Sequence, residues 1–393
     1  MSTTKQKNQL RQLAIGAATG ICAGLLGYAL TSFLVDKSTI KSLAYSDSSW
    51  ENPLKVALIL FGIWAAWCAH ELGHLISGLA QGFKFHLFIV GLLGVRRNAA
   101  TDRIEWFVNR DVNLAGGIAA TVPVRDEPGL RQKFALIVAM GPVVSLLGAL
   151  IALGLSYASL PLLETQNTVL LRLAINGGFA FGAASLLLFV ATTLPGRTGT
   201  FFTDRARFFR LIRGGRAAEI EQATLTVLAK TMGGEPYSAL DKSQLEAIAT
   251  EDSTMFQVYA RNLLFRYHLD VNEPEEALRQ IQLTEPLIGD QPALFKNEVL
   301  KELALAYALI AQDVEKAQFF LSQIHPAWDQ KAGAAGLLIQ SAMANALQEF
   351  ERSRELAHSG LKLLPELLTK SEDKQNKRLL EQLGKKPVAT AFL

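Results

Sequence analysis

The chain has 393 residues, of which 50% are hydrophobic and only 19% are charged, an apolar composition for a soluble protein of this length. Its formal net charge of +3 is too small to suggest that it binds nucleic acid. The two cysteines, Cys22 and Cys68, both lie within apolar stretches, which argues against a disulfide framework and against a cysteine-based zinc site.

Four apolar segments are long enough to cross a bilayer, which requires about 20 mostly apolar residues per helix. They cover residues 13–35, 55–81, 133–156 and 170–194. A short basic stretch precedes the first segment, so this segment is either an uncleaved helix or a signal peptide. Its apolar run is longer than that of a usual signal peptide and no convincing small-residue cleavage site follows, which favours the uncleaved helix.

Lysine and arginine in the connecting segments indicate the orientation, because basic loops tend to stay on the cytoplasmic side. The N-terminus, the connection 82–132 and the stretch after residue 194 are basic, whereas the connection 157–169 contains no lysine or arginine. We therefore expect an integral membrane protein of the bacterial inner (cell) membrane with both termini in the cytoplasm. The basic, partly apolar stretch Arg205–Arg216 is interpreted as a segment that lies along the anionic inner leaflet.

Between the second and third apolar segments, Phe83, Phe85, Leu87 and Ile89 alternate with other residues and lead into glycines. An apolar period of two predicts a short strand or hairpin. An extended peptide often binds by pairing with such an edge, so we expect the 83–95 segment to hold a substrate in this way.

From about residue 217 the pattern predicts amphipathic helices throughout. Three stretches that begin at Tyr267, Tyr307 and Ala346 share one layout of a helix, a polar turn, a second helix and a proline. This layout resembles a tetratricopeptide repeat, although the spacing is uneven and the hallmark Trp and Gly positions are missing, so a plain helical bundle is the alternative. Either arrangement predicts a surface for a protein partner or for regulation.

His70-Glu71-Leu72-Gly73-His74 form the pattern His-Glu-x-x-His inside the second apolar segment. Residues four apart share one face of a helix, so both imidazoles can bind one metal ion, and imidazole is a good zinc ligand. Glu71 lies beside that face, where a carboxylate can act as the general base for a water molecule. A charged group deep in a bilayer costs roughly 2.5–3.5 kcal/mol on insertion scales and usually marks function. The pattern does not distinguish zinc from another divalent ion.

At these residues the sequence resembles the site-2 protease family of intramembrane zinc metalloproteases. The similarity continues through the glycine-rich stretch Leu114–Ile118 to Met140–Ser145, where Ser145 stands at a position at which Asn is common. It covers about residues 54–215 and does not extend to the C-terminal helices.

The resemblance implies a third zinc ligand, an Asp that follows the proline at the end of an apolar helix. Asp204 is the candidate in this chain, with Arg205 where the family has Gly. The alternative is that Asp204 serves as an ion-pair partner of the arginines around it. His86, in the strand-like segment, is interpreted as an interfacial histidine.

The predicted fold is an all-α membrane protein with about four transmembrane helices, a short β-like cytoplasmic insert and a soluble α-helical repeat-like domain. The predicted parts are an N-terminal helix with an external loop, a metalloprotease core, a cytoplasmic tetratricopeptide-like domain and a polar tail, at residues 1–53, 54–215, 216–370 and 371–393.

By the resemblance, the function is the zinc-dependent hydrolysis of peptide bonds in or near transmembrane segments of membrane-protein substrates. The alternative function is a membrane-anchored helical-repeat scaffold whose metal site is structural or vestigial. The expected partners are the substrates, the lipid bilayer and a protein bound at the C-terminal domain. We also expect that domain to affect substrate choice or regulation more than metal content.

Overall fold

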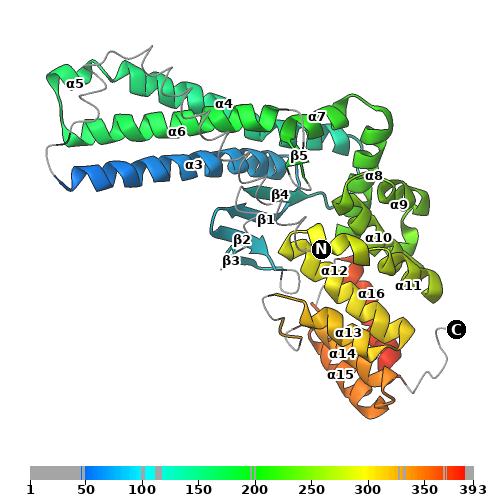
Figure 1. The fold of residues 1–393 in the computed structure, drawn as a ribbon. Helices are drawn as coiled ribbons and strands as arrows, with labels where there is room; N and C mark the ends of the chain where they lie inside the picture. Colours follow the sequence, from blue (N-terminus) through cyan, green and yellow to red (C-terminus); the bar gives the residue numbers. More distant parts are fainter. Residues whose placement is uncertain are drawn as a thin grey trace. The chain divides into compact units, whose positions relative to one another are not determined.

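The computed structural model describes residues 46, 49–98, 102–110, 117–194, 197–198, 201–325, 328–330, 333–365, 368 and 370–385. In these ranges the chain is mostly helical and contains a small antiparallel sheet (Figure 1). The chain divides into two compact units, one with residues up to Gly73 and Met140–Leu194, the other with His74–Ala139 and Pro195–Leu393. The four parts predicted from the sequence stay predictions, because they divide the chain by expected function, whereas these two units divide it by contacts between residues.

Three helices in the described ranges are long and apolar enough to cross a membrane, which confirms three of the predicted segments as helices. They are α3 (Glu51–Ala80), α4 (Leu130–Ala158), which the short α5 (Leu162–Thr165) follows, and α6 (Val169–Thr193). The predicted segment 13–35 lies outside the described residues, so a fourth span stays a prediction. The membrane itself, the compartment and the side of the termini also stay predictions.

Small residues bring the three apolar helices of the first unit close together. A Cβ atom added at Gly62 of α3 would lie 3.1 Å from the backbone nitrogen of Phe181 in α6. One added at Gly182 of α6 would lie 2.7 Å from Leu153 Cγ in α4. Glycines at such contacts allow backbones to approach, as is common where helices pack within membranes.

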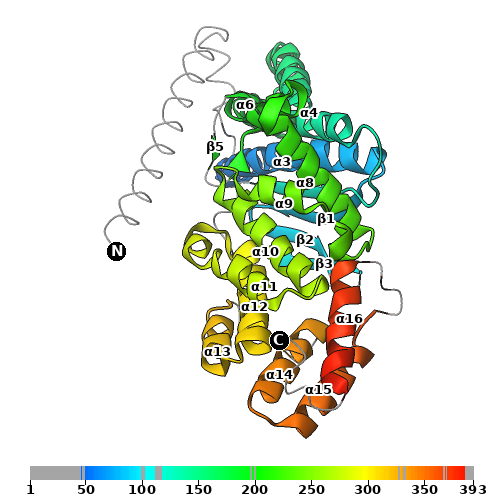
Figure 2. The same ribbon diagram turned by 90° about the vertical axis from the view of Figure 1, so that its right-hand side faces the viewer.

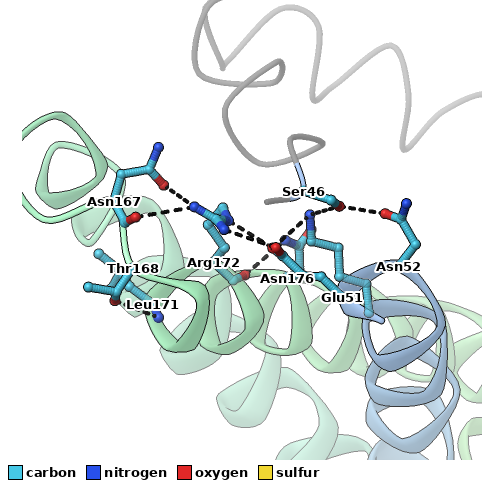
Figure 3. Close-up of polar contacts among 9 residues, drawn as sticks. Ser46, Glu51, Asn52, Asn167, Thr168, Leu171, Arg172 and Asn176 are labelled. Carbon is cyan, nitrogen blue, oxygen red and sulfur yellow. Dashed lines mark hydrogen bonds and ion pairs between the residues drawn. The ribbon is translucent and has the colours of Figure 1, made fainter. Parts of the chain in front are cut away.

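A buried ion pair joins the first turns of α3 and α6. Arg172 and Glu51 are both fully buried, and Arg172 donates from Nε and Nη2 to the two Glu51 carboxylate oxygens at 2.8 and 2.9 Å (Figure 3). The Asn167 side chain accepts a further bond from Arg172 at 2.7 Å, and Lys55 Nζ lies 3.2 Å from Glu51. Because loss of one partner would leave a buried charge without its counter-ion, this pair specifies which helix ends meet.

The predicted β-like insert is a four-stranded antiparallel sheet in the second unit. Its strands are β1 (Lys84–Val90), β2 (Leu93–Arg97), β3 (Ile104–Val108) and β4 (Ile118–Val122), in the order β3-β2-β1-β4. The strand expected from the alternation at Phe83–Ile89 is therefore confirmed as β1. The expected pairing of a substrate with residues 83–95 is wrong, because β1 and β2 each pair with strands on both sides.

The remainder of the second unit is helical after a short ribbon of β5 (Arg197–Thr198) and β6 (Phe201–Phe202). Its helices are α7 (Asp204–Ile212), α8 (Gly215–Met232), α9 (Lys242–Ala249), α10 (Thr254–Asp270), α11 (Pro274–Gln282), α12 (Ala293–Ala306), α13 (Val314–Ser322), α14 (Ala334–Ala346), α15 (Phe350–Lys362) and α16 (Ser371–Gly384).

Three helix pairs, α10–α11, α12–α13 and α14–α15, follow the repeating layout expected from the sequence (Figure 2). In each pair the polar turn contains one residue with a positive φ angle, namely Asn272 at 61°, Gln312 at 53° and Gln348 at 62°. A left-handed residue at the same place in each turn points to a common way of reversing the chain. The tetratricopeptide type itself stays a prediction.

Residues 371–384, predicted as part of a polar tail, form helix α16. Leu379 and Leu380 are buried in the main core of the helical region, and Arg266 donates to the Gln375 and Asn376 side chains at 3.0 Å. Gln375 and Asn376 each lie four residues before one of these leucines, so the amide and leucine side chains share one face of α16. This face packs against the helical region, although the rest of the segment is charged.

Substitution of two nearby glycines in α6 tests how closely the apolar helices pack. We expect Gly182→Ala to lower the thermal unfolding midpoint of the detergent-solubilised full-length protein, because the added methyl group meets Leu153, and overpacking costs about 1–3 kcal/mol. The control is Gly177→Ala, where a Cβ atom has no heavy atom within 4 Å, so the midpoint should stay or rise. Equal destabilisation by both substitutions would contradict this packing.

Candidate metal centre

The two histidines of the His-Glu-x-x-His pattern lie one turn apart on α3, so their side chains share a face of the helix. His70 is 4% exposed and Glu71 is 9% exposed, so the pattern lies in a largely buried position. Two imidazoles and a carboxylate are thus carried by an otherwise apolar helix, as expected from the sequence.

Ser145 of α4 orients the first histidine. The Ser145 hydroxyl oxygen is buried and lies 2.8 Å from His70 Nδ1. A hydrogen bond at Nδ1 fixes the plane of an imidazole ring and makes Nε2 the nitrogen that a metal ion would take. Gly73 permits the close approach of α4, since a Cβ atom there would lie 2.7 Å from the Met140 carbonyl oxygen.

A backbone carbonyl of α4 orients the second histidine. His74 Nδ1 lies 2.8 Å from the Ile137 carbonyl oxygen. Because a carbonyl oxygen can only accept, Nδ1 of the neutral ring carries the proton and Nε2 is the available ligand atom. His74 Nε2 lies 3.5 Å from Oδ2 of Asp204, the first residue of α7.

His70, His74 and Asp204 form a group that could hold a metal ion, because their ligand atoms all lie within 4.8 Å of one another. One continuous helix carries both histidines, and His74 belongs to the same compact unit as Asp204. Two imidazole nitrogens and one carboxylate oxygen, with both Nδ1 atoms held by α4, fit a metal site with three protein ligands. This donor set suits zinc and also other divalent ions that prefer nitrogen and oxygen.

The arginines near Asp204 have other contacts. Arg207 and Arg210 lie 3.5 and 3.2 Å from the buried carboxylate of Glu221, and the Arg205 guanidinium lies 5.7 Å from the centre of the Phe209 ring. Asp204 lies close to His74. Two of the basic side chains interpreted as a membrane anchor, Arg207 and Arg210, form ion pairs with Glu221 of α8.

Apart from Ser145, the other residues singled out in the sequence are not members of this group or lie outside the described ranges. His86 is on β1, and its pKa is lowered by desolvation and by the cations Lys370 and Arg97. Residues 111–116, which hold most of the glycine-rich stretch, and Pro195 are outside the described residues.

Two glycine contacts at the site had no identifiable partner in the sequence. A Cβ atom at Gly78 of α3 would collide with the Thr121 side chain of β4, so this strand lies directly against the helix that carries the histidines. Gly73 has a similar role toward α4. A glycine in a helix indicates that another segment packs closely there, but the sequence does not show which distant residue makes the contact.

Comparison of the chain with protein-family models, with curated proteins and with solved structures finds no match. The similarity to site-2 proteases accordingly stays a prediction that rests on the sequence motifs.

Replacement of the serine that orients His70 tests the metal centre directly. We expect Ser145→Ala to weaken Zn²⁺ binding about 10-fold, because outer-shell partners of histidine ligands typically contribute that much or more. The affinity is measured on the full-length protein by competition with a chromophoric chelator. The control is Ser159→Ala, an exposed serine whose hydroxyl donates to the Leu155 carbonyl. Unchanged affinity in Ser145→Ala would contradict the orienting role.

Proposed function

We propose that the chain is an intramembrane zinc metalloprotease in which His70, His74 and Asp204 hold the metal and Glu71 is the general base. The observation that carries the proposal is the convergence of two imidazoles and one carboxylate, with ligand atoms within 4.8 Å, beside the largely buried Glu71. The two histidines and Glu71 are on α3, a helix that is long and apolar enough to cross a membrane.

Zinc, when bound at such a site, polarises a substrate carbonyl group and makes water more acidic. Glu71 follows His70 directly on α3, so its carboxylate lies beside the ligand face. There it takes a proton from the attacking water and passes it to the leaving amide nitrogen as the peptide bond breaks. The low exposure of Glu71 keeps competing solvent away from this carboxylate.

The proposed substrate is a membrane protein whose transmembrane helix unwinds locally. Unwinding is required because the backbone groups of an intact helix are hydrogen-bonded to one another, which shields its peptide bonds from attack. An unwound segment needs new hydrogen-bond partners, and a strand edge supplies them. Of the two outer strands of the sheet, β4 contacts α3 through Thr121 and Gly78. We therefore assign substrate pairing to β4 in place of β1 and β2.

The alternative of a helical-repeat scaffold with a structural metal site differs from the protease at one residue. A structural site requires the histidines and the aspartate but no general base. Glu71 is therefore the residue at which the two functions predict different results.

We expect Glu71→Gln to reduce cleavage of co-expressed single-pass membrane proteins by about 10²–10⁴-fold, the usual contribution of a general base, while zinc content stays at the wild-type level. Cleavage is followed by immunoblot and zinc by elemental analysis of the purified proteins. The control is Glu164→Gln, an exposed carboxylate in α5. Zinc in both proteins without Glu71-dependent cleavage would favour the scaffold, and wild-type protein without metal would refute the proposal.

A further inference from the structure

We infer that Glu221 of α8 is a positioning residue for the third metal ligand, because its ion pairs hold α7 in the place where Asp204 faces His74. The inference rests on the proposed function for the role of Asp204 as a ligand. It concerns contacts within the second compact unit.

A single buried carboxylate receives two arginines from α7. Glu221 is fully buried, and its Oε1 and Oε2 lie 3.2 Å from Arg210 Nε and 3.5 Å from Arg207 Nη2. Arg210 also donates from Nη2 to Glu251, which follows α9, at 2.9 Å. Two of the three arginines of α7 are thus tied to α8 and to the segment after α9.

Asp204 belongs to the part of α7 that these ion pairs hold. It precedes Arg207 by three residues, so the two side chains lie on neighbouring positions of one helix face. The Arg207 guanidinium also lies 4.6 Å from the centre of the Phe134 ring in α4, and the Arg210 guanidinium lies 4.3 Å from that of Phe202. The charged groups of α7 are therefore packed as well as paired.

The same apolar cluster supports α7 and the histidine that Asp204 faces. Leu211 of α7 packs with Leu225 and Ala229 of α8 and with Ile137 of α4. The Ile137 carbonyl is the group that orients His74. The position of Asp204 and the orientation of His74 are consequently set from one core, which α8 completes.

Helix α7 has nine residues and is not expected to be stable by itself, because the helical state of isolated helices shorter than about 12–15 residues is only marginally stable in water. Contacts with neighbouring helices must therefore position α7. Without the Glu221 charge, the half-buried Arg207 loses this ion pair and Arg210 keeps only the one with Glu251, so α7 shifts to solvate the Arg207 guanidinium. A shift of about 1 Å is enough to disturb a metal-binding geometry. This inference gives α8 a part in metal binding, in addition to the expected effect of the C-terminal domain on substrate choice or regulation.

The test uses the full-length protein in detergent with Glu221→Gln, which keeps the side-chain size and removes the charge. Zn²⁺ affinity is measured by chelator competition, and Co²⁺ is added separately to record the absorption spectrum of the site. We expect affinity to fall about 10-fold and the Co²⁺ spectrum to approach that of Asp204→Asn. The matched control is Glu219→Gln, an exposed carboxylate two residues earlier on α8, which should match the wild type.

A double-substitution cycle separates positioning from general destabilisation. If Glu221 acts through Asp204, Glu221→Gln weakens Zn²⁺ binding in the wild-type background and causes no further loss in the Asp204→Asn background. Equal losses in both backgrounds, or no loss in the wild type, would overturn the inference. If Glu221→Gln does not fold, Glu221→Asp, which keeps the charge on a shorter side chain, is used in the same cycle. Wild-type protein that binds neither ion would instead overturn the proposed function.

Discussion

Three polar contacts between α3 and α4 set the geometry on which the candidate centre depends. His70 meets the Ser145 hydroxyl, His74 meets the Ile137 carbonyl, and Gln81 donates to the Lys133 carbonyl at 2.9 Å. As residue numbers rise along α3 they fall along α4, so the two helices run antiparallel with the histidines facing the partner helix. Two of the three acceptors or donors on α4 are backbone carbonyls, and hydrogen bonding to them does not vary with the side chains that occupy those positions.

Two buried ion pairs join helices of this protein. Glu51 and Arg172 join two apolar helices, and Glu221 joins α7 to α8. About 19 residues of α3 separate Glu51 from His70, which corresponds to about 28 Å of helix. The Glu51–Arg172 pair thus lies far along α3 from the candidate metal centre, whereas the Glu221 pair lies on the helix that carries Asp204.

The parts of the fold that depend on local patterns could be predicted from the sequence. Three apolar helices, the strand at Phe83–Ile89 and the shared face of His70 and His74 each follow from a period that a few neighbouring residues display. Asp204 lies 130 residues after His74, and only the family resemblance suggested it. The orienting partner of His74 is a main-chain carbonyl, which leaves no trace in the sequence.

Contacts between distant segments explain where the structure corrects or extends the expectations. The 83–95 segment lost its free edge because β4, which begins at Ile118, pairs with β1. Glu221 looks like one more charge on a surface helix, but it is buried and pairs with two arginines of the stretch interpreted as a membrane anchor, while the anchor itself stays a prediction. Three leucines of the charged segment 371–384, Leu379, Leu380 and Leu383, pack on the core of the helical region.

The ion pair between Glu51 and Arg172 also has a consequence for the order in which the protein is assembled. Its partners are 121 residues apart, so the ribosome completes α3 well before it produces α6. At synthesis rates of about 5–20 residues per second, this interval lasts roughly 6–24 s. During that time Lys55, one turn further along the same helix, has already been synthesised and can form an ion pair with Glu51. Formation of the bidentate pair with Arg172 therefore requires that α6 has come together with α3.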